Sequence, residues 1–430
     1  MTDHEFLTNL PILNKKLQKE VEDNLIFRAW FQNVDFDAYQ AANGQIKYHQ
    51  KLAGTGAVHV MKDALAANSD HALMAMEMEL SQDPKFGDQD LEGTGESLVN
   101  KYARIYVNLI SGVANTKQGI MDKVRNDRML DHYKRALPAL RRWFAKTLNA
   151  QMISALYEGH SYNVTTGVAS SPNGIGVVAK YHPNMYYNGI DPSALTGEIT
   201  AIGTEGYNKT DQNIYDNVYT GYSNLKLISP YFLNELSDLC EARKIARIVK
   251  HEGADLYLTV MNREELNTLW QNSEFRAAVR YAFSGKGYKN PEFMPESYIY
   301  GDHFLMLDRH LPRAYNTTRR DFVGVNGWRE IGQEGANNKF NRSIFVIGDG
   351  ALGMEVDPDN DLQFEPEAYN FKQQQEIAGF IINGSSRKEY VSKDDEAAYF
   401  ATNQSSKTFC AAKEVTNQSS LQVIVKARKA

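Results

Sequence analysis

The chain has 430 residues, 42% of them hydrophobic and 23% charged, which is ordinary for a globular protein of one complex domain or roughly two to three smaller ones. Its net charge of −6 excludes a global attraction to nucleic acid, because binding to phosphates needs concentrated lysine and arginine. The two cysteines, Cys240 and Cys410, exclude a disulfide framework and zinc-type spacing, so we expect free thiols in a reducing compartment.

The N-terminal segment predicts neither export nor membrane insertion. Met1 to Glu20 lacks a basic stretch followed by an apolar run, and nowhere in the chain do roughly 18 apolar residues follow one another. Short helical patterns such as Phe6 to Asn24 are followed by irregular chain through Gly54-Thr55-Gly56. We interpret residues 1–67 as an N-terminal arm.

A long two-stranded arm is predicted for residues 68–110. From Ala72 to Leu80, Leu and Met alternate with Ala and Glu, as in a strand with one buried face. A turn-rich stretch from Asp83 to Gly95 separates it from a second alternation, in which the apolar residues from Ile105 to Leu109 share one face. Two strands alone are marginal in water, so we expect the apolar face of this arm to pack on another surface, such as a second copy of the chain.

One very long amphipathic helix is predicted from Asp127 to Glu158. Its apolar residues recur with helical spacing, and Lys and Arg lie off the apolar stripe. The helix would be roughly 48 Å long. Pro138 removes a hydrogen bond from its interior, so we expect a kink near Leu137 or two helices in line, and Gly159 supplies the stop.

The rest of the chain mixes helices and strands without a regular βαβ order, which indicates an α+β fold. A loop-rich stretch with many Gly, Asn and Tyr runs from Ser161 to Thr220. A helix is expected from Pro230 to Lys250, then a strand from Asp255 to Met261, then a helix that begins after Asn262 and runs to about Ala282. Further strands are predicted at Phe304 to Leu307, Ser343 to Ile347, Ile377 to Ile382 and Leu421 to Lys426.

The sharpest enzymatic candidate is Gly348-Asp349-Gly350-Ala351-Leu352-Gly353, a G-x-G-x-x-G directly after a predicted strand. A dinucleotide site needs a helix to begin there, so that its N-terminal amides meet the pyrophosphate. Met354 to Pro358 has no helical period, so the sequence speaks against that site.

A second candidate is Asp357-Pro358-Asp359-Asn360-Asp361, which resembles the start of a calcium loop. Leu362 stands where the sharp turn needs Gly, and Ala368 stands where a bidentate Glu belongs, so an EF-hand is rejected. A looser cation site built from the three aspartates stays open beside a plain acidic turn.

No catalytic, cofactor-binding or metal-binding residue is assigned. The chain holds no nucleophile elbow, H-E-x-x-H motif, Walker loop or Cys beside a suitable His, and its histidines lack metal spacing. The Lys and Arg residues of the long helix and the pair Arg387-Lys388 are expected to be solvated surface rather than contacts to DNA.

Several modest motifs together resemble one family. In chain order they are Gly87 to Gly93 with Glu96, Met121-Asp122 before the long helix with Leu137, Leu140 and Trp143, the Leu156-Tyr157-Glu158-Gly159 stop, Leu256 to Trp270, Arg342 with Gly348 to Gly353, and Ile382-Asn383-Gly384 with Lys388. The same order is found in major capsid proteins similar to those of N-four-like podoviruses. The resemblance covers residues 70 to 425, whereas Pro138 and the stretch from Ser161 to Thr220 depart from the family pattern.

This resemblance implies the Hong Kong 97 capsid fold, an α+β fold with an N-terminal arm, an extended β-hairpin E-loop, a peripheral domain with a long spine helix, and an axial domain. The implied parts are the N-terminal arm at 1–67, the E-loop at 68–110, the peripheral domain with the spine helix and a loop-rich insertion at 111–228, the axial domain at approximately 229–340, and returning peripheral strands at 341–430.

The resemblance also implies a function: a major capsid protein, not an enzyme, that assembles with itself into hexamers and pentamers of an icosahedral phage head. Implied partners are portal, scaffold and optional decoration proteins, together with packaged double-stranded DNA held by weak nonspecific contact; no membrane and no cofactor are implied. The chain would be assembled in the bacterial host cytoplasm and reside in the virion.

Two alternatives stay open at this point. A nucleotide- or metal-dependent enzyme would use the loop from Gly348 to Gly353. A tail or decoration protein would not need both the two-stranded arm and the long helix.

Overall fold

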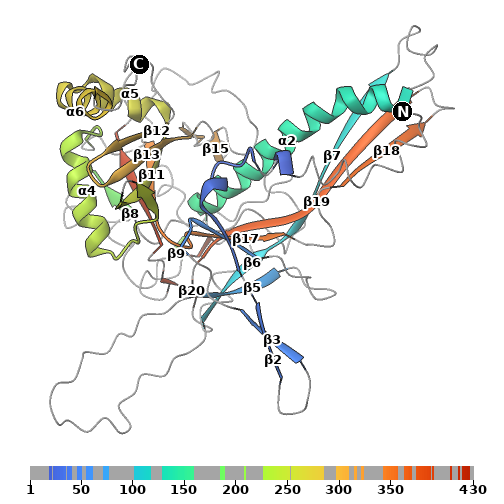
Figure 1. Ribbon diagram of the computed structural model, residues 1–430, viewed down its shortest axis with the longest axis horizontal. Helices are drawn as coiled ribbons and strands as arrows, with labels where there is room; N and C mark the ends of the chain where they lie inside the picture. Colours follow the sequence, from blue (N-terminus) through green and yellow to red (C-terminus); the bar gives the residue numbers. More distant parts are fainter. Residues whose placement is uncertain are drawn as a thin grey trace.

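The protein is built around two sheets, and the long helix α2 lies along a ribbon of strands that extends far from one of them (Figure 1). The computed structural model describes residues 19–21, 23–34, 36–40, 46–50, 55–61, 71–76, 101–117, 128–158, 185–188, 208–209, 226–251, 253–284, 297–308, 314–316, 321–323, 342–356, 363–369, 374–388, 390–391, 407–408, 415–416 and 419–426.

The described helices are η1 (Arg28–Trp30), α2 (Arg128–Glu158), α4 (Pro230–Ala242), α5 (Arg263–Gln271) and α6 (Ser273–Ser284). The six-stranded sheet holds β1 (Phe31–Asn33), β4 (Val58–Met61), β17 (Leu352–Val356), β19 (Gln374–Arg387), β18 (Gln363–Tyr369) and β7 (Asn108–Lys117). The seven-stranded sheet holds β12 (Ser297–Tyr300), β13 (His303–Leu307), β11 (Ala254–Met261), β16 (Arg342–Ile347), β23 (Ser420–Val425), β8 (Met185–Tyr187) and β10 (Val249–His251). Two-stranded pairs are β2 (Phe36–Gln40) with β3 (Ile46–Gln50), β5 (His71–Met76) with β6 (Lys101–Tyr106), β9 (Asn208–Lys209) with β21 (Lys407–Thr408), β14 (Ala314–Asn316) with β15 (Asp321–Val323), and β20 (Tyr390–Val391) with β22 (Val415–Thr416).

The seven-stranded sheet is buried on both faces, because its strands alternate between two hydrophobic clusters. Tyr257 and Met261 of β11 pack with the apolar sides of α4, α5 and α6. Leu258 and Val260 of the same strand point to the opposite cluster, which contains α2 and the N-terminal segment. Figure 1 shows α4, α5 and α6 gathered on the side of this sheet away from α2. The strands predicted within β11, β13, β16, β19 and β23 are confirmed.

The helix predicted from Pro230 to Lys250 is wrong in its second half. α4 ends at Ala242, and Lys244 adopts a positive φ of 56°. The N–H of Ile245 then donates to the carbonyl of Cys240 at 2.9 Å, which is the bonding of a left-handed helix stop. This stop frees the following residues to extend into β10.

The helix predicted after Asn262 begins where expected but is divided. The Asn262 side chain accepts the N–H of Glu264 at 3.3 Å, as a helix cap does. Asn272 is extended and caps a new helix, α6, by accepting the N–H of Glu274 at 2.8 Å. A second capping residue inside the helical pattern is therefore the reason for the break.

α2 confirms the predicted long helix almost to the residue, and it continues through Pro138 as one element. The alternative of two helices in line is wrong. Pro138 lies on the exposed side of α2, where water can bond the carbonyl that loses its partner. The buried side carries Phe144, Leu148 and Met152, which pack on β7 and β19 in one cluster.

The contact between α2 and the ribbon is shaped by a pair of glycines. Gly112 of β7 lies opposite Gly379 of β19, and the Trp143 ring covers Gly112 so closely that an added Cβ would come within 2.7 Å of ring atom Cζ3. Trp143 also makes an edge contact to Phe144, with ring centroids 4.9 Å apart. The absence of side chains at this step of the ladder therefore sets how close helix and ribbon can lie.

The N-terminal segment contributes buried residues to the core at two places, between Val21 and Val34 and between Ala57 and Met61. Asn149 of α2 accepts the N–H of Ile26 at 2.9 Å and donates to the carbonyl of Asn24 at 3.3 Å. The chain then enters the six-stranded sheet as β1, which runs parallel to β4. The prediction of irregular chain up to Gly56 is wrong here, because strand pairing with the sheet satisfies this backbone.

Gly112→Ala should lower the free energy of unfolding by about 1–3 kcal/mol, because the new methyl overlaps a rigid indole. In a Trp143→Ala background the same substitution should cost little, because the ring that it meets is gone. Denaturant unfolding of the four proteins of this cycle measures the coupling. Equal costs in both backgrounds would show that the ring does not determine the need for glycine.

Candidate assembly surface

The base of the predicted arm is present as the antiparallel pair β5 and β6. Ala72, Met74 and Ile105 share one face of this pair, and they are buried together with Val34 and Met61. All of these residues belong to one chain. The base of the arm therefore packs on its own subunit, and no second copy is needed at this end.

Leu109 does not share the face of Ile105, contrary to the predicted alternation. β6 ends at Tyr106, and β7 continues with the opposite parity, so that Ile110 is buried and Leu109 is 56% exposed. The reason is that β7 leaves the arm and pairs with β19, whose side facing α2 receives Ile110. The tip of the arm, residues 77–100, lies outside the described residues.

The side of the ribbon turned away from α2 is apolar and solvent-accessible. We call it the outer ribbon face; it consists of Leu109, Ser111 and Val113 of β7 and their cross-strand partners Ile382, Phe380 and Ala378 of β19. Val113 is 60% exposed, and the three β19 residues are half-buried. Together the exposed side chains of β7 and the half-buried ones of β19, all apolar except Ser111, make a contiguous patch, which is typical of an interaction surface.

The glycines of the G-x-G-x-x-G motif are explained by packing. Gly350 has a φ of 60°, and a Cβ there would lie 2.8 Å from His59 Cε1. A Cβ on Gly353 would lie 2.6 Å from Ile105 Cδ1 at the base of the arm, and one on Gly348 would lie 2.9 Å from Ile245 Cγ2 and 3.0 Å from the carbonyl oxygen of Ser419. The strand β17 follows the turn, which confirms the prediction that no helix begins there.

The aspartate of the same motif ties three elements together. Asp349 Oδ1 accepts the N–H of Gly56 at 2.6 Å and lies 3.2 Å from His59 Nε2. Lys388 Nζ donates to His59 Nδ1 at 2.9 Å, so the ring carries its proton on Nε2. Burial raises the pKa of Asp349, but hydrogen bonds from His59 and Gly56 and the charge of Lys388 hold it below its usual range. This cluster fastens β4 and the end of β19 to the turn.

Arg387 and Lys388 are buried, which corrects the expectation that both are solvated. Arg387 Nη1 donates to the carbonyl of Leu156 at 2.9 Å, in the last turn of α2. A cation at a helix C-terminus satisfies a carbonyl that has no partner in the helix and opposes the negative end of the helix dipole. The end of β19 thereby fixes the end of α2.

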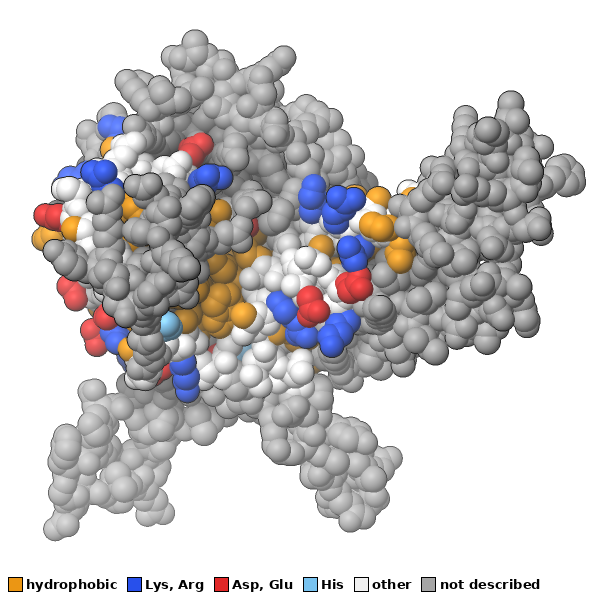
Figure 2. All heavy atoms as spheres, turned by 45° about the horizontal axis from the view of Figure 1, so that its top comes forward, with side chains coloured by type: hydrophobic (Ala, Val, Ile, Leu, Met, Phe, Trp, Pro, Cys, Tyr) orange, Lys and Arg blue, Asp and Glu red, His pale blue; other side chains and the backbone are white. Residues whose placement is uncertain are grey.

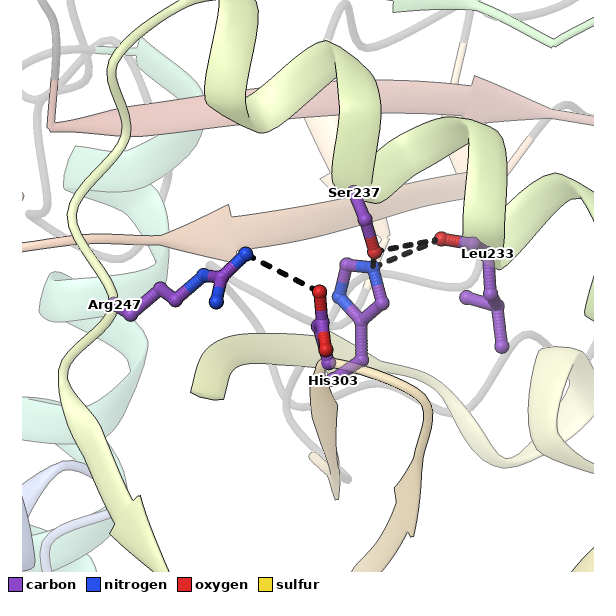
Figure 3. Close-up of polar contacts among 5 residues, drawn as sticks. Leu233, Ser237, Arg247 and His303 are labelled. Atoms are coloured by element: carbon purple, nitrogen blue, oxygen red, sulfur yellow. Dashed lines mark hydrogen bonds and ion pairs between the residues drawn. The ribbon is translucent and has the colours of Figure 1, made fainter. Parts of the chain in front are cut away.

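His303 joins the layers of the seven-stranded sheet and its helices (Figure 3). Its Nε2 donates to the carbonyl of Leu233 at 2.9 Å and lies 3.0 Å from Ser237 Oγ, both on α4. Its Nδ1 accepts the hydroxyl of Thr259 on β11 at 2.8 Å. Burial lowers the pKa of His303 to about 4, although the bond to Leu233 opposes this. A neutral ring enclosed by structural partners is a core component rather than a general base.

The pKa of His303 makes the fold acid-sensitive. Its pKa falls from 6.5 in the unfolded chain to about 4, so the stability that it supports is complete above pH 6.5 and is lost as the pH falls towards 4. The loss is about 3 kcal/mol across that window. Neighbouring Asp302 raises this pKa and Arg247 lowers it, and the two form an ion pair at 3.2 Å.

The His303→Gln variant should be less stable than wild type at pH 7. Its free energy of unfolding should fall less steeply between pH 6.5 and 4, because Gln can form hydrogen bonds but does not take up a proton. His251→Gln, on the half-buried β10, should keep the wild-type decline. Urea unfolding of the three proteins at several pH values measures the difference. Parallel pH profiles for wild type and His303→Gln would show that this ring does not limit acid stability.

The remaining candidates supply no further site within the described ranges. There, no three His, Cys, Asp or Glu side chains lie close enough to hold a metal ion. Cys240 is buried, and burial raises the pKa of its thiol to about 12, so it is an unreactive core residue. The acidic turn from Asp357 to Asp361 and Cys410 lie outside the described residues. None of the described helices is long and apolar enough to cross a membrane.

Comparison with known proteins finds similarity in structure but not in sequence. No protein-family model and no curated protein matches the chain. The capsid of Ralstonia phage GP4 superposes with a TM-score of 0.56 and 13% identity, covering 87% of this chain and 88% of that one. The Cyanophage Pam1 capsid superposes with a TM-score of 0.54 and 12% identity, covering 84% of this chain and 86% of that one. The head of Helicobacter pylori bacteriophage KHP40 superposes with a TM-score of 0.52 and 12% identity, covering 86% of this chain and 88% of that one.

These similarities establish the fold. The chain has a Hong Kong 97-like α+β fold, as the motif order in the sequence implies. The similarity extends over most of each chain, so it reflects the fold rather than one shared motif.

Proposed function

We propose that the chain is a major capsid protein that assembles with itself into the hexamers and pentamers of an icosahedral phage head enclosing double-stranded DNA. The observation that carries the proposal is the outer ribbon face, an apolar surface on a thin extended ribbon. The likeness to three phage head proteins supports it. A subunit that leaves such a surface uncovered is stabilised by association with its own kind.

In this proposal the arm of one subunit covers the outer ribbon face of the next. Leu109 and Val113 are more than half exposed, and burying each contributes about 1–2 kcal/mol. The arm base is fixed to its own subunit by Met74 and Ile105, so the arm can project without detaching. A contact between two different surfaces can repeat from subunit to subunit, and it forms a ring where the rotation between neighbours closes.

The domain assignment is likewise a proposal. Residues 1–67 are the N-terminal arm and residues 68–110 the E-loop. The peripheral domain, at 111–228 with returning strands at 341–430, holds α2 and most of the six-stranded sheet, whose β1 and β4 lie within the arm. The axial domain, at approximately 229–340, holds α4, α5 and α6 with β10 to β13 of the seven-stranded sheet. Residues 341–430 contribute strands to both sheets.

The enzyme alternative has little support from the described residues. Each glycine of the motif from Gly348 to Gly353 has a packing reason, and Asp349 is occupied by main-chain and side-chain partners. A phosphate-binding turn would instead leave its amides open, whereas the N–H of Gly350 donates to the carbonyl of Gly56 at 2.7 Å. We therefore assign no catalytic role to the chain.

Finer features follow from the motif order in the sequence. We place the protein among coat proteins similar to those of N-four-like podoviruses. Portal and scaffold proteins, with decoration proteins as an option, would be its partners, and the chain would be assembled in the host cytoplasm and end in the virion.

Leu109→Lys with Val113→Lys should leave the subunit folded and prevent assembly, because charges in a buried contact cannot be solvated there. The matched variant Leu109→Met with Val113→Ile keeps the face apolar and should assemble. Sedimentation and negative-stain microscopy measure assembly, and circular dichroism checks the fold. If the lysine variant formed shells in normal numbers, the outer ribbon face would not be part of the interface between subunits.

Removing Gln82 to Thr94 should give a folded subunit that assembles poorly. The deletion leaves β5 and β6 and their buried contacts intact, but it shortens the part of the arm that reaches a neighbour. Circular dichroism and sedimentation are to be compared on the same sample. The arm would be no assembly device if the deletion variant formed normal shells.

A further inference from the structure

One side of α2 carries positive charge although the protein as a whole is acidic. From His132 to Tyr157 the sequence contains five Lys or Arg residues and no Asp or Glu. Arg142 and Lys146 are exposed and lie one helical turn apart, so they project from the same side. Trp143 beside them is 39% exposed. The helix thus combines cations with an accessible aromatic ring.

The N-terminal segment extends this basic surface. Contacts of Glu20 with Arg141, and of Ile26 with Asn149, show that the segment runs along α2. It adds the exposed cations Lys19 and Arg28. We call the resulting surface the basic face; its charged residues in the described part of the chain are Lys19, Glu20, Asp23, Arg28, Arg141, Arg142 and Lys146. Figure 2 shows the blue side chains gathered there around a few red ones.

The basic face and the outer ribbon face lie on opposite sides of one ribbon. Ile110 and Ile381 point to α2, whereas Leu109 and Ile382, their neighbours in sequence, point away from it. In a shell whose subunits join through the outer ribbon face, the basic face is turned to the other side of the wall. In that arrangement this cluster of cations lies on the side of the ribbon away from the neighbour's arm.

We propose that the basic face lines the interior of the shell and contacts the phosphate backbone of the packaged double-stranded DNA. The inference rests on the proposed capsid function and adds the surface that meets the genome. Charge complementarity selects the ligand: clustered cations release the counterions condensed on a duplex, and this favours binding without sequence preference. Arg142 donates Nε–H to the carbonyl of Pro138, which orients the guanidinium of this exposed residue while its Nη atoms take no part in that bond.

The test compares two charge reversals of equal size in the full-length chain. Arg142→Glu with Lys146→Glu alters the basic face, and Lys250→Glu with Arg276→Glu makes the same change in net charge at exposed sites on β10 and α6. Binding of a random-sequence duplex is measured by fluorescence anisotropy over a range of salt. Polyglutamate of matched charge serves as a second probe, and circular dichroism and negative-stain microscopy of each variant report folding and assembly.

The basic-face variant should bind the duplex about tenfold more weakly at low salt, and the slope of log K against log salt should fall by about two. The control should match wild type apart from a small uniform loss. Equal loss in both variants would overturn the proposal, as would binding of polyglutamate as tightly as DNA, which would point to an acidic protein partner. A selective loss of DNA binding without shell formation would contradict the capsid function while leaving the DNA surface in place.

Discussion

The packing of α2 across one side of the β7–β19 ribbon is the constraint on which the rest of the structure depends. The ribbon of β7, β19 and β18 has two faces, and the buried side of one long helix covers one of them. The glycine pair at Gly112 and Gly379 lets the Trp143 ring lie against the ladder, and Arg387 fixes the helix end. Because a single helix covers only one side, the other side remains apolar and open.

The turn between β16 and β17 is the second constraint, because it carries the chain from one sheet to the other. Main-chain bonds from Gly350 to Gly56 and from Leu352 to Ala57, at 2.7 and 3.1 Å, hold this turn to β4. A series of polar contacts from Lys388 through His59 to Asp349 holds the same turn. The segment from Gly348 to Gly353, whose sequence resembles a nucleotide-binding loop, is where the two sheets and the base of the arm meet in this fold.

Local patterns predicted much of this fold and little of its surfaces. The long helix and the strands within β11, β16 and β23 follow from periodicity that tertiary packing does not oppose. The ends of α4 and α5 were mispredicted because Lys244 and Asn272 stop the helices by backbone geometry that the apolar pattern does not record. The outer ribbon face was missed because the exposed side of β7 is decided by its pairing with β19, distant in sequence. Arg387 and Lys388 were expected at the surface because their partners, Leu156 and His59, are equally distant.

A cryo-electron microscopy map of particles assembled from the purified chain with its native assembly partners tests the central claim most directly. The account predicts closed shells in which the arm of one subunit lies over Leu109 and Val113 of its neighbour, with α2 on the inner side of the wall. Shells in which the outer ribbon face stays open to solvent in every subunit would contradict the account, as would a persistent monomer or dimer under all assembly conditions.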